Sequence, residues 1–137
     1  MGFRWGRART TQRGPHDFAQ RVVARVRTEA LGDAHSFSVS FSAHTGIGTL
    51  PILYYGNAAQ KQKYVPGMAS GQLKGCYCLT EPNAGSDAAA LETTAVADGD
   101  DFVLNGTKIW VTNGGWAGLF LVYARTNPNV SKAKGVS

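Results

Sequence analysis

The chain of 137 residues is 43% hydrophobic and 17% charged, and its formal net charge is +5. That length allows one domain with its own core or two incomplete ones, and the composition is that of a globular protein. Because no apolar run is long enough to span a bilayer and no secretory signal is recognisable, we expect neither a membrane protein nor a secreted one.

The positive charge is concentrated at the start of the chain. The first 27 residues carry seven arginines and one aspartate, whereas the remainder carries seven basic and eight acidic side chains. We expect residues 1–28 to form a solvated basic leader, with a targeting peptide and a nucleic-acid-binding arm as alternatives. Phe3 and Trp5 are too few to make a stacking platform among the first arginines, so we expect no nucleic-acid partner.

Helical patterns dominate the first half. Apolar side chains recur every four residues over 18–31, which predicts a helix. Residues 36–49 alternate like a strand, but their length and small side chains also suit a helix. Pro51 predicts a break, and Asn57 predicts the start of a capped helix over residues 58–64, followed by a loop at 67–71.

Short strands replace the helical patterns at residue 75, so the sequence predicts a join near residue 74. Turn-forming residues separate the strands, and the Asp-Gly-Asp-Asp turn at 98–101 predicts a hairpin. The predicted strands are 76–79, 93–97, 102–104, 108–112 and 119–124.

Cys76 and Cys78 are the only cysteines. Their spacing would place both on one face of a strand, where we expect reduced thiols packed as small hydrophobic side chains. A metal site usually needs a wider loop and more ligands, and the histidines form no cluster. The sequence therefore predicts no metal.

Two segments of the β part could carry chemistry. Residues 80–87 offer hydroxyls, a glycine and free backbone N–H groups that could cradle an anion or the polar edge of a ring, although an ordinary hydrogen-bonded turn would look the same. Glu81 and Asp87 could be general bases, but carboxylates in such loops more often accept from nearby backbone donors. In a strand, Trp110 and Thr112 would share one face and suit a flat heteroaromatic ligand such as a flavin, with a core tryptophan as the alternative.

Together these segments resemble the signature of the acyl-CoA dehydrogenase family. The resemblance rests on YCLTEPNAGSD at 77–87, on LNGTKIWVTN at 104–113, and on residues 44–56, 60–66 and 69–71 upstream. It covers about Leu31 to Arg125 and is closest to the long- and very-long-chain branch.

The resemblance implies an α+β fold. A helical N-terminal segment (residues 29–74) would be followed by the first part of an antiparallel, barrel-like middle β domain (residues 75–137), and it favours the helix over 36–49. It also implies an FAD site, at which Ser86 would additionally meet the acyl-CoA substrate. The residues expected to border the flavin are Tyr77, Leu79, Thr80, Gly85, Ser86, Trp110, Val111 and Thr112.

The family removes a proton α to the thioester while hydride leaves the β carbon for the flavin, and electrons then pass to an electron-transfer flavoprotein. By resemblance we expect a homo-oligomer in the bacterial cytoplasm or the mitochondrial matrix. The family's catalytic glutamate lies in a C-terminal helical bundle that has no counterpart here, so we assign no catalytic residue. We expect a truncated part of the enzyme that is inactive alone; the alternatives are a non-catalytic flavin- or acyl-CoA-binding module and a non-functional product.

Overall fold

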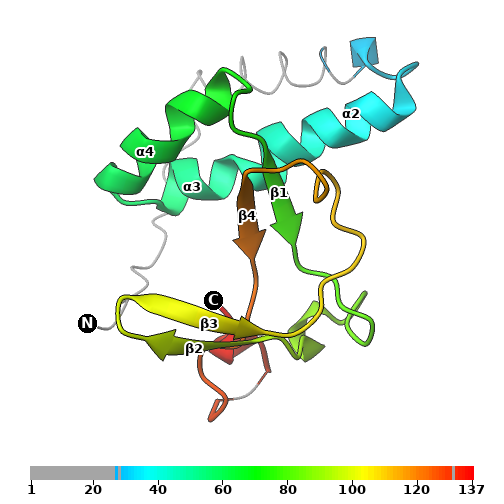
Figure 1. The fold of residues 1–137 in the computed structure, drawn as a ribbon. Coiled ribbons are helices and arrows are strands. Elements are labelled where there is room, and N and C mark those ends of the chain that lie inside the picture. Colours follow the sequence, from blue (N-terminus) through cyan, green and yellow to red (C-terminus); the bar gives the residue numbers. More distant parts are fainter. Residues whose placement is uncertain (1–26, 28, 131) are drawn as a thin grey trace, which may run out of the picture. The chain divides into compact units, whose positions relative to one another are not determined.

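The computed structural model describes Arg27, residues 29–130 and residues 132–137 (Figure 1). The chain divides into two compact units, residues 1–35 and 36–137, and the elements described below belong to the second apart from the first residue of α2. Nearly all of the predicted leader and of the predicted helix over 18–31 lies outside the described residues. In the part of the chain that is described, no helix combines the length and apolar character needed to cross a membrane.

Residues 36–49 are helical, which confirms the interpretation that the resemblance favoured. Helix α2 (His35–Ser42) continues into a π-helical segment (Ala43–Gly48), and α3 (Leu50–Tyr55) follows. Small side chains are needed here because a Cβ on Gly48 would lie only 3.2 Å from the backbone carbon of Gly75. Pro51 sits in the first turn of α3, where its missing N–H is tolerated, and the helical run is interrupted at Thr49 just before α3 begins.

Helix α4 (Ala58–Ala69) begins as predicted. The Asn57 side chain accepts from the Gln60 backbone N–H at 2.8 Å, and the Gln60 side chain accepts from the Asn57 N–H at 2.9 Å. The predicted loop at 67–71 is wrong over its first three residues. The helix passes through Pro66 and ends before Gly71, whose φ of 75° is the left-handed conformation that glycine adopts freely.

Two small sheets make up the β part (Figure 1). Strand β1 (Gly75–Cys78) pairs in parallel with β4 (Leu119–Val122), and β2 (Thr94–Asp98) pairs antiparallel with β3 (Asp101–Asn105). The α+β class and the predicted hairpin are confirmed, and the described strands form no barrel. The parallel pair was not expected; it is possible because the long connection through the hairpin lets β4 return in the direction of β1.

The predicted strand over 108–112 is wrong. Trp110 and Asn113 have φ values of 56° and 69°, which no strand can contain. The backbone N–H of Ile109 instead bonds to the carbonyl of Thr80 at 2.9 Å. Residues 106–118 are therefore a loop that lies against the end of β1.

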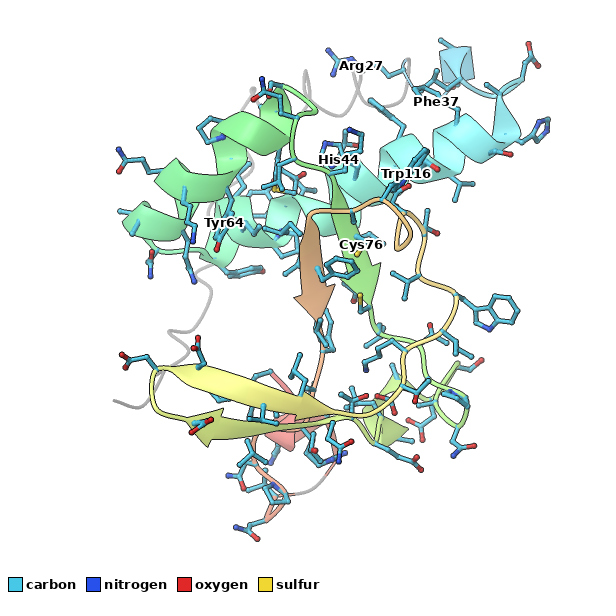
Figure 2. All side chains as sticks on the ribbon, viewed as in Figure 1. Arg27, Phe37, His44, Tyr64, Cys76 and Trp116 are labelled. Atoms are coloured by element: carbon cyan, nitrogen blue, oxygen red, sulfur yellow. The ribbon has the colours of Figure 1, made fainter. Side chains whose placement is uncertain are left out.

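His44 joins the helical segment to the first strand. Its Nδ1 accepts from the N–H of Gly75 at 3.1 Å, so its Nε2 carries the proton and donates to the carbonyl of Met68 at 3.0 Å. Figure 2 labels His44 beside the start of β1 and Cys76 within that strand. Met68 and Cys76 are fully buried at this seam, which fixes where β1 begins and hence where the loop after it lies.

Candidate functional site

The loop that follows β1 is the centre of the candidate site. Backbone hydrogen bonds of 3.1 Å run both ways between Glu81 and Ala84 and close a tight Pro-Asn turn. Ala84, the last residue of this turn, is buried, whereas Gly85 and Ser86 are exposed on the bend that follows it. A short rigid turn thus presents an exposed, hydroxyl-bearing bend.

A second segment, residues 108–112, is tied to this loop. Besides the bond between Ile109 and Thr80, the Nζ of Lys108 donates to the carbonyl of Leu79 at 3.0 Å. The two segments are almost thirty residues apart in sequence but adjacent in space. Both segments were predicted to border one ligand, and the structure brings their backbones together.

Glu81 is not available as a general base. Its side chain is 3% exposed and accepts from Lys108 at 2.6 Å, from the N–H of Thr93 at 3.0 Å and from the N–H of Glu92. Burial by itself would raise the pKa of this carboxyl, but the hydrogen bonds from Lys108, Thr93 and Glu92 outweigh it and lower the pKa to about 2. An ionised carboxylate with these partners holds structure together rather than taking a proton from a substrate.

The remaining predicted site residues differ in their exposure. Tyr77 is half-buried with its ring 5.0 Å from that of Tyr123, and burial, followed by the contact with Tyr123, raises the pKa of Tyr77 to about 12. Leu79, Thr80, Val111 and Thr112 are half-buried. The hydroxyls of Thr80 and Thr112 take part in none of the hydrogen bonds between described residues.

Trp110 differs most from its expected environment. It is 87% exposed, and its left-handed backbone means that it does not share a strand face with Thr112. Val111 beside it turns inward and lines a cavity of about 380 Å³ together with Cys78 and Val122. An indole that projects into solvent next to an inward-facing valine is free to lie against a ligand.

A second cavity, of about 410 Å³, lies along α2. Figure 2 labels three of its lining residues, Phe37, His44 and Trp116. Asn113 anchors the loop beside it, donating from Nδ2 to the carbonyl of Ser40 at 2.9 Å, while its buried Oδ1 has no partner among the described residues. This cavity is almost entirely apolar and none of the predicted site residues lines it.

Cys76 and Cys78 are free, buried thiols with Sγ atoms 3.9 Å apart, which confirms the interpretation made from their spacing. Burial, and next the neighbouring Cys78, raises the pKa of Cys76 to about 12, and burial also raises the pKa of Cys78, so both thiols are unreactive. The described residues contain no group of three or more potential metal-ligating side chains.

Lys108, His44 and Asn113 were not predicted to have a role in the site, although each fixes one end of a site segment. Their partners lie at least 24 residues away in the chain. No periodicity or turn signal could have identified such pairs.

Two protein-family models match this chain and together identify its family. The model of the acyl-CoA dehydrogenase N-terminal domain matches residues 14–72, and that of the middle domain matches residues 76–137. The chain belongs to the acyl-CoA dehydrogenase family. The first match starts at residue 14, inside the range that the sequence analysis treated as a leader.

Curated relatives from bacteria and mammals agree with this assignment. A probable acyl-CoA dehydrogenase of Bacillus subtilis is 47% identical over 109 residues, which is 78% of this chain and 18% of the relative. The human mitochondrial very long-chain specific acyl-CoA dehydrogenase is 48% identical over 108 residues, which is 77% of this chain and 16% of the relative. The chain thus spans less than a fifth of the length of these acyl-CoA dehydrogenases.

A solved acyl-CoA dehydrogenase has the same fold over the shared region. The crystal structure of the Bacillus anthracis enzyme complexed with FAD superposes with a TM-score of 0.69 at 45% identity, covering 72% of this chain and 18% of that one. The helical segment and the partial sheet therefore match the N-terminal and middle parts of an acyl-CoA dehydrogenase.

Proposed function

We propose that this chain supplies the β-domain wall of an FAD site in an acyl-CoA dehydrogenase, a flavoenzyme that oxidises acyl-CoA thioesters between the α and β carbons. The observation that carries the proposal is the backbone bond between Thr80 and Ile109, which holds the two signature segments side by side. Among the described residues the hydroxyls of Thr80 and Thr112 form no hydrogen bond, and the indole of Trp110 is exposed. Two hydroxyls and an aromatic plane fit a flavin ring.

Each residue of this wall has a proposed role. The Thr80 hydroxyl bonds the pyrimidine edge of the flavin, the Thr112 hydroxyl bonds near its reactive nitrogen, and Trp110 flanks the ring. Ser86, exposed on the bend, also meets the thioester arm of acyl-CoA. The bound flavin would supply the hydride acceptor. The other residues proposed to border the cofactor are Tyr77, Leu79, Gly85 and Val111.

Glu81 and the three carboxylates of the hairpin turn offer no candidate for the catalytic base. Glu81 is neutralised by Lys108, and three other carboxylates lie at the β2–β3 turn. We therefore propose that this 137-residue chain binds flavin weakly and does not by itself oxidise acyl-CoA. Proton abstraction needs a positioned base, which the rest of the family fold would supply.

Family membership also supports proposals about partners and location. In an assembly with the full fold, the electron acceptor would be an electron-transfer flavoprotein and the enzyme would be a homo-oligomer. The substrate would be a long- or very-long-chain acyl-CoA, in the bacterial cytoplasm or the mitochondrial matrix.

Titration of FAD with the purified 137-residue chain tests the proposed site. We expect saturable quenching of flavin fluorescence with a dissociation constant between about 1 μM and 1 mM, too weak for the complex to survive gel filtration. The double variant Thr80→Val/Thr112→Val should weaken binding, while its circular dichroism spectrum stays that of the parent chain. Absence of saturable quenching would overturn the proposal for this chain.

A further inference from the structure

We propose that Glu81 and Lys108 are positioning residues of the FAD site, acting through the segments they hold rather than by touching the flavin. This inference rests on the proposed function. The pair lies between the two signature segments and joins both of them to the start of β2. Its role would be to set the distance between Thr80 and the Trp110–Thr112 segment.

Three stretches of backbone converge on the pair. Lys108 donates to the carbonyl of Leu79, on one side of Thr80, and to the carboxylate of Glu81, on the other. The same carboxylate accepts from the N–H groups of Glu92 and Thr93, at the entry to β2. Thr80 is thus held on both sides by one ammonium group.

The geometry next to Lys108 follows from this anchor. Ile109, the next residue, donates its N–H to the carbonyl of Thr80 at 2.9 Å. A lysine that reaches across both neighbours of Thr80 therefore also fixes which backbone carbonyl Ile109 meets. Loss of the anchor would let the 108–112 segment slip relative to the loop.

Trp110 lies between two such anchors. Its left-handed φ of 56° is unfavourable for a bulky side chain and persists only where the surroundings over-determine it. Lys108 and Ile109 hold the chain on one side, and Asn113 holds it on the other through the carbonyl of Ser40. The pair therefore maintains the conformation that presents the exposed indole.

Burial explains why a charged pair suits this task. The side chains of Lys108 and Glu81 are 10% and 3% exposed, so each charge requires the other as its partner. Buried ion pairs add little net stability compared with apolar packing, but removing one partner strands the other, and the paired geometry is specific. Such a pair therefore specifies one arrangement of the two loops and adds little to the stability of the fold.

The test compares Glu81→Gln and Lys108→Met with matched controls that remove the same charges at exposed positions away from the pair, Asp100→Asn and Lys134→Met. Three quantities are measured for the 137-residue chain: the dissociation constant of FAD, the visible circular dichroism of added flavin, and amide hydrogen exchange. We expect both pair variants to weaken FAD binding about tenfold or more and to change the flavin dichroism, with the controls unchanged. Lys108→Arg keeps the charge and should recover most of the affinity.

Hydrogen exchange separates this proposal from the proposed function. In the pair variants the Ile109 amide should exchange about tenfold faster, whereas the Gly118 amide, bonded to Lys74, should keep its rate. Should the parent chain fail to bind FAD, the proposed function falls and the exchange rates alone decide whether the pair holds the loops. Unchanged Ile109 exchange, or unchanged FAD affinity in a parent chain that binds, would overturn the role of the pair.

Discussion

The imidazole of His44 is held between the backbone N–H of Gly75 and the carbonyl of Met68, so a single neutral side chain joins the π-helical segment, the end of α4 and the start of β1. Since β1 leads directly into the proposed flavin loop, this ring sets the starting point of the site.

His44→Ala should destabilise the fold. The change leaves a part-buried N–H on Gly75 and a carbonyl on Met68 without their partner, and each stranded group costs about 1–3 kcal/mol. Urea denaturation followed by circular dichroism would measure the loss. Gln62→Ala, on the exposed side of α4, is the control and should stay within about 0.5 kcal/mol of the parent. A His44→Ala chain as stable as this control would contradict the stabilising role of the two His44 hydrogen bonds.

Gly106→Ala should also destabilise the fold, because the added methyl group has no room. Gly106 has a φ of 156°, and an added Cβ would lie 2.7 Å from the Cα of Thr93, where backbone leaves no room. We expect a loss of about 1–3 kcal/mol in the free energy of unfolding. Gly115→Ala is the matched control, because a Cβ there meets no atom within 4 Å. Equal unfolding midpoints for the two variants would show that the loop relaxes around the new methyl group.

The buried pair predicts how stability changes in acid. Burial opposes ionisation of Glu81, but its hydrogen bonds prevail and lower its pKa to about 2, below the ordinary value of 4.5. A depressed carboxyl pKa stabilises the folded state fully above the unfolded-state value, and this contribution is lost as pH falls from about 4.5 towards 2. Glu81→Gln should therefore be less stable than the parent at pH 7, and the difference should shrink across that window. Parallel stability curves for the two chains between pH 5 and pH 2, scanned with denaturant at each pH, would contradict the assignment.

Trp110→Ala and Thr112→Val should each reduce FAD affinity. One lost hydrogen bond from a hydroxyl is worth about 1 kcal/mol, or roughly fivefold in the dissociation constant, and loss of a stacked indole should be at least as large. The controls are Trp116→Ala, a 67% exposed tryptophan on the other cavity, and Thr107→Val, an exposed threonine. If all four variants bind FAD alike, the site assignment is wrong.

Addition of a long-chain acyl-CoA under anaerobic conditions should leave the flavin of the 137-residue chain oxidised. The reason is that Glu81, a carboxylate of the flavin loop, is buried and held by Lys108. Absorbance near the flavin maximum would be followed, with dithionite reduction as the positive control. Bleaching by acyl-CoA, with the mass of the chain confirmed, would require a base among the residues present.

Local signals predicted the elements whose interactions are local. The Asn57–Gln60 cap and the β2–β3 hairpin were predicted because each depends on residues within a few positions of one another. The sequence pattern of residues 36–49 did not distinguish a helix from a strand. Small residues there are required by close approach to Gly75 in β1, and that requirement leaves no periodicity in the sequence. Only the resemblance favoured the helix there.

The backbone conformation around Trp110 was predicted less well than the surrounding fold. Residues 108–112 were predicted to form a strand, but bonds from Lys108, Ile109 and Asn113 to distant residues impose a left-handed bend at Trp110 instead. Tertiary contacts of this kind override local preference and leave no trace in neighbouring residues. The Glu81–Lys108 pair escaped prediction for the same reason.

The β2–β3 hairpin has a consequence for handling the protein. All five residues of β3 are exposed, including Phe102, Val103 and Leu104, and Val96 opposite Val103 is exposed as well. A two-stranded ribbon with solvent-exposed apolar side chains tends to associate with other apolar surfaces, including a second copy of itself. This hydrophobic attraction weakens on cooling. Concentrated samples should therefore turn cloudy on warming and clear again in the cold, and Phe102→Lys should raise the clouding temperature.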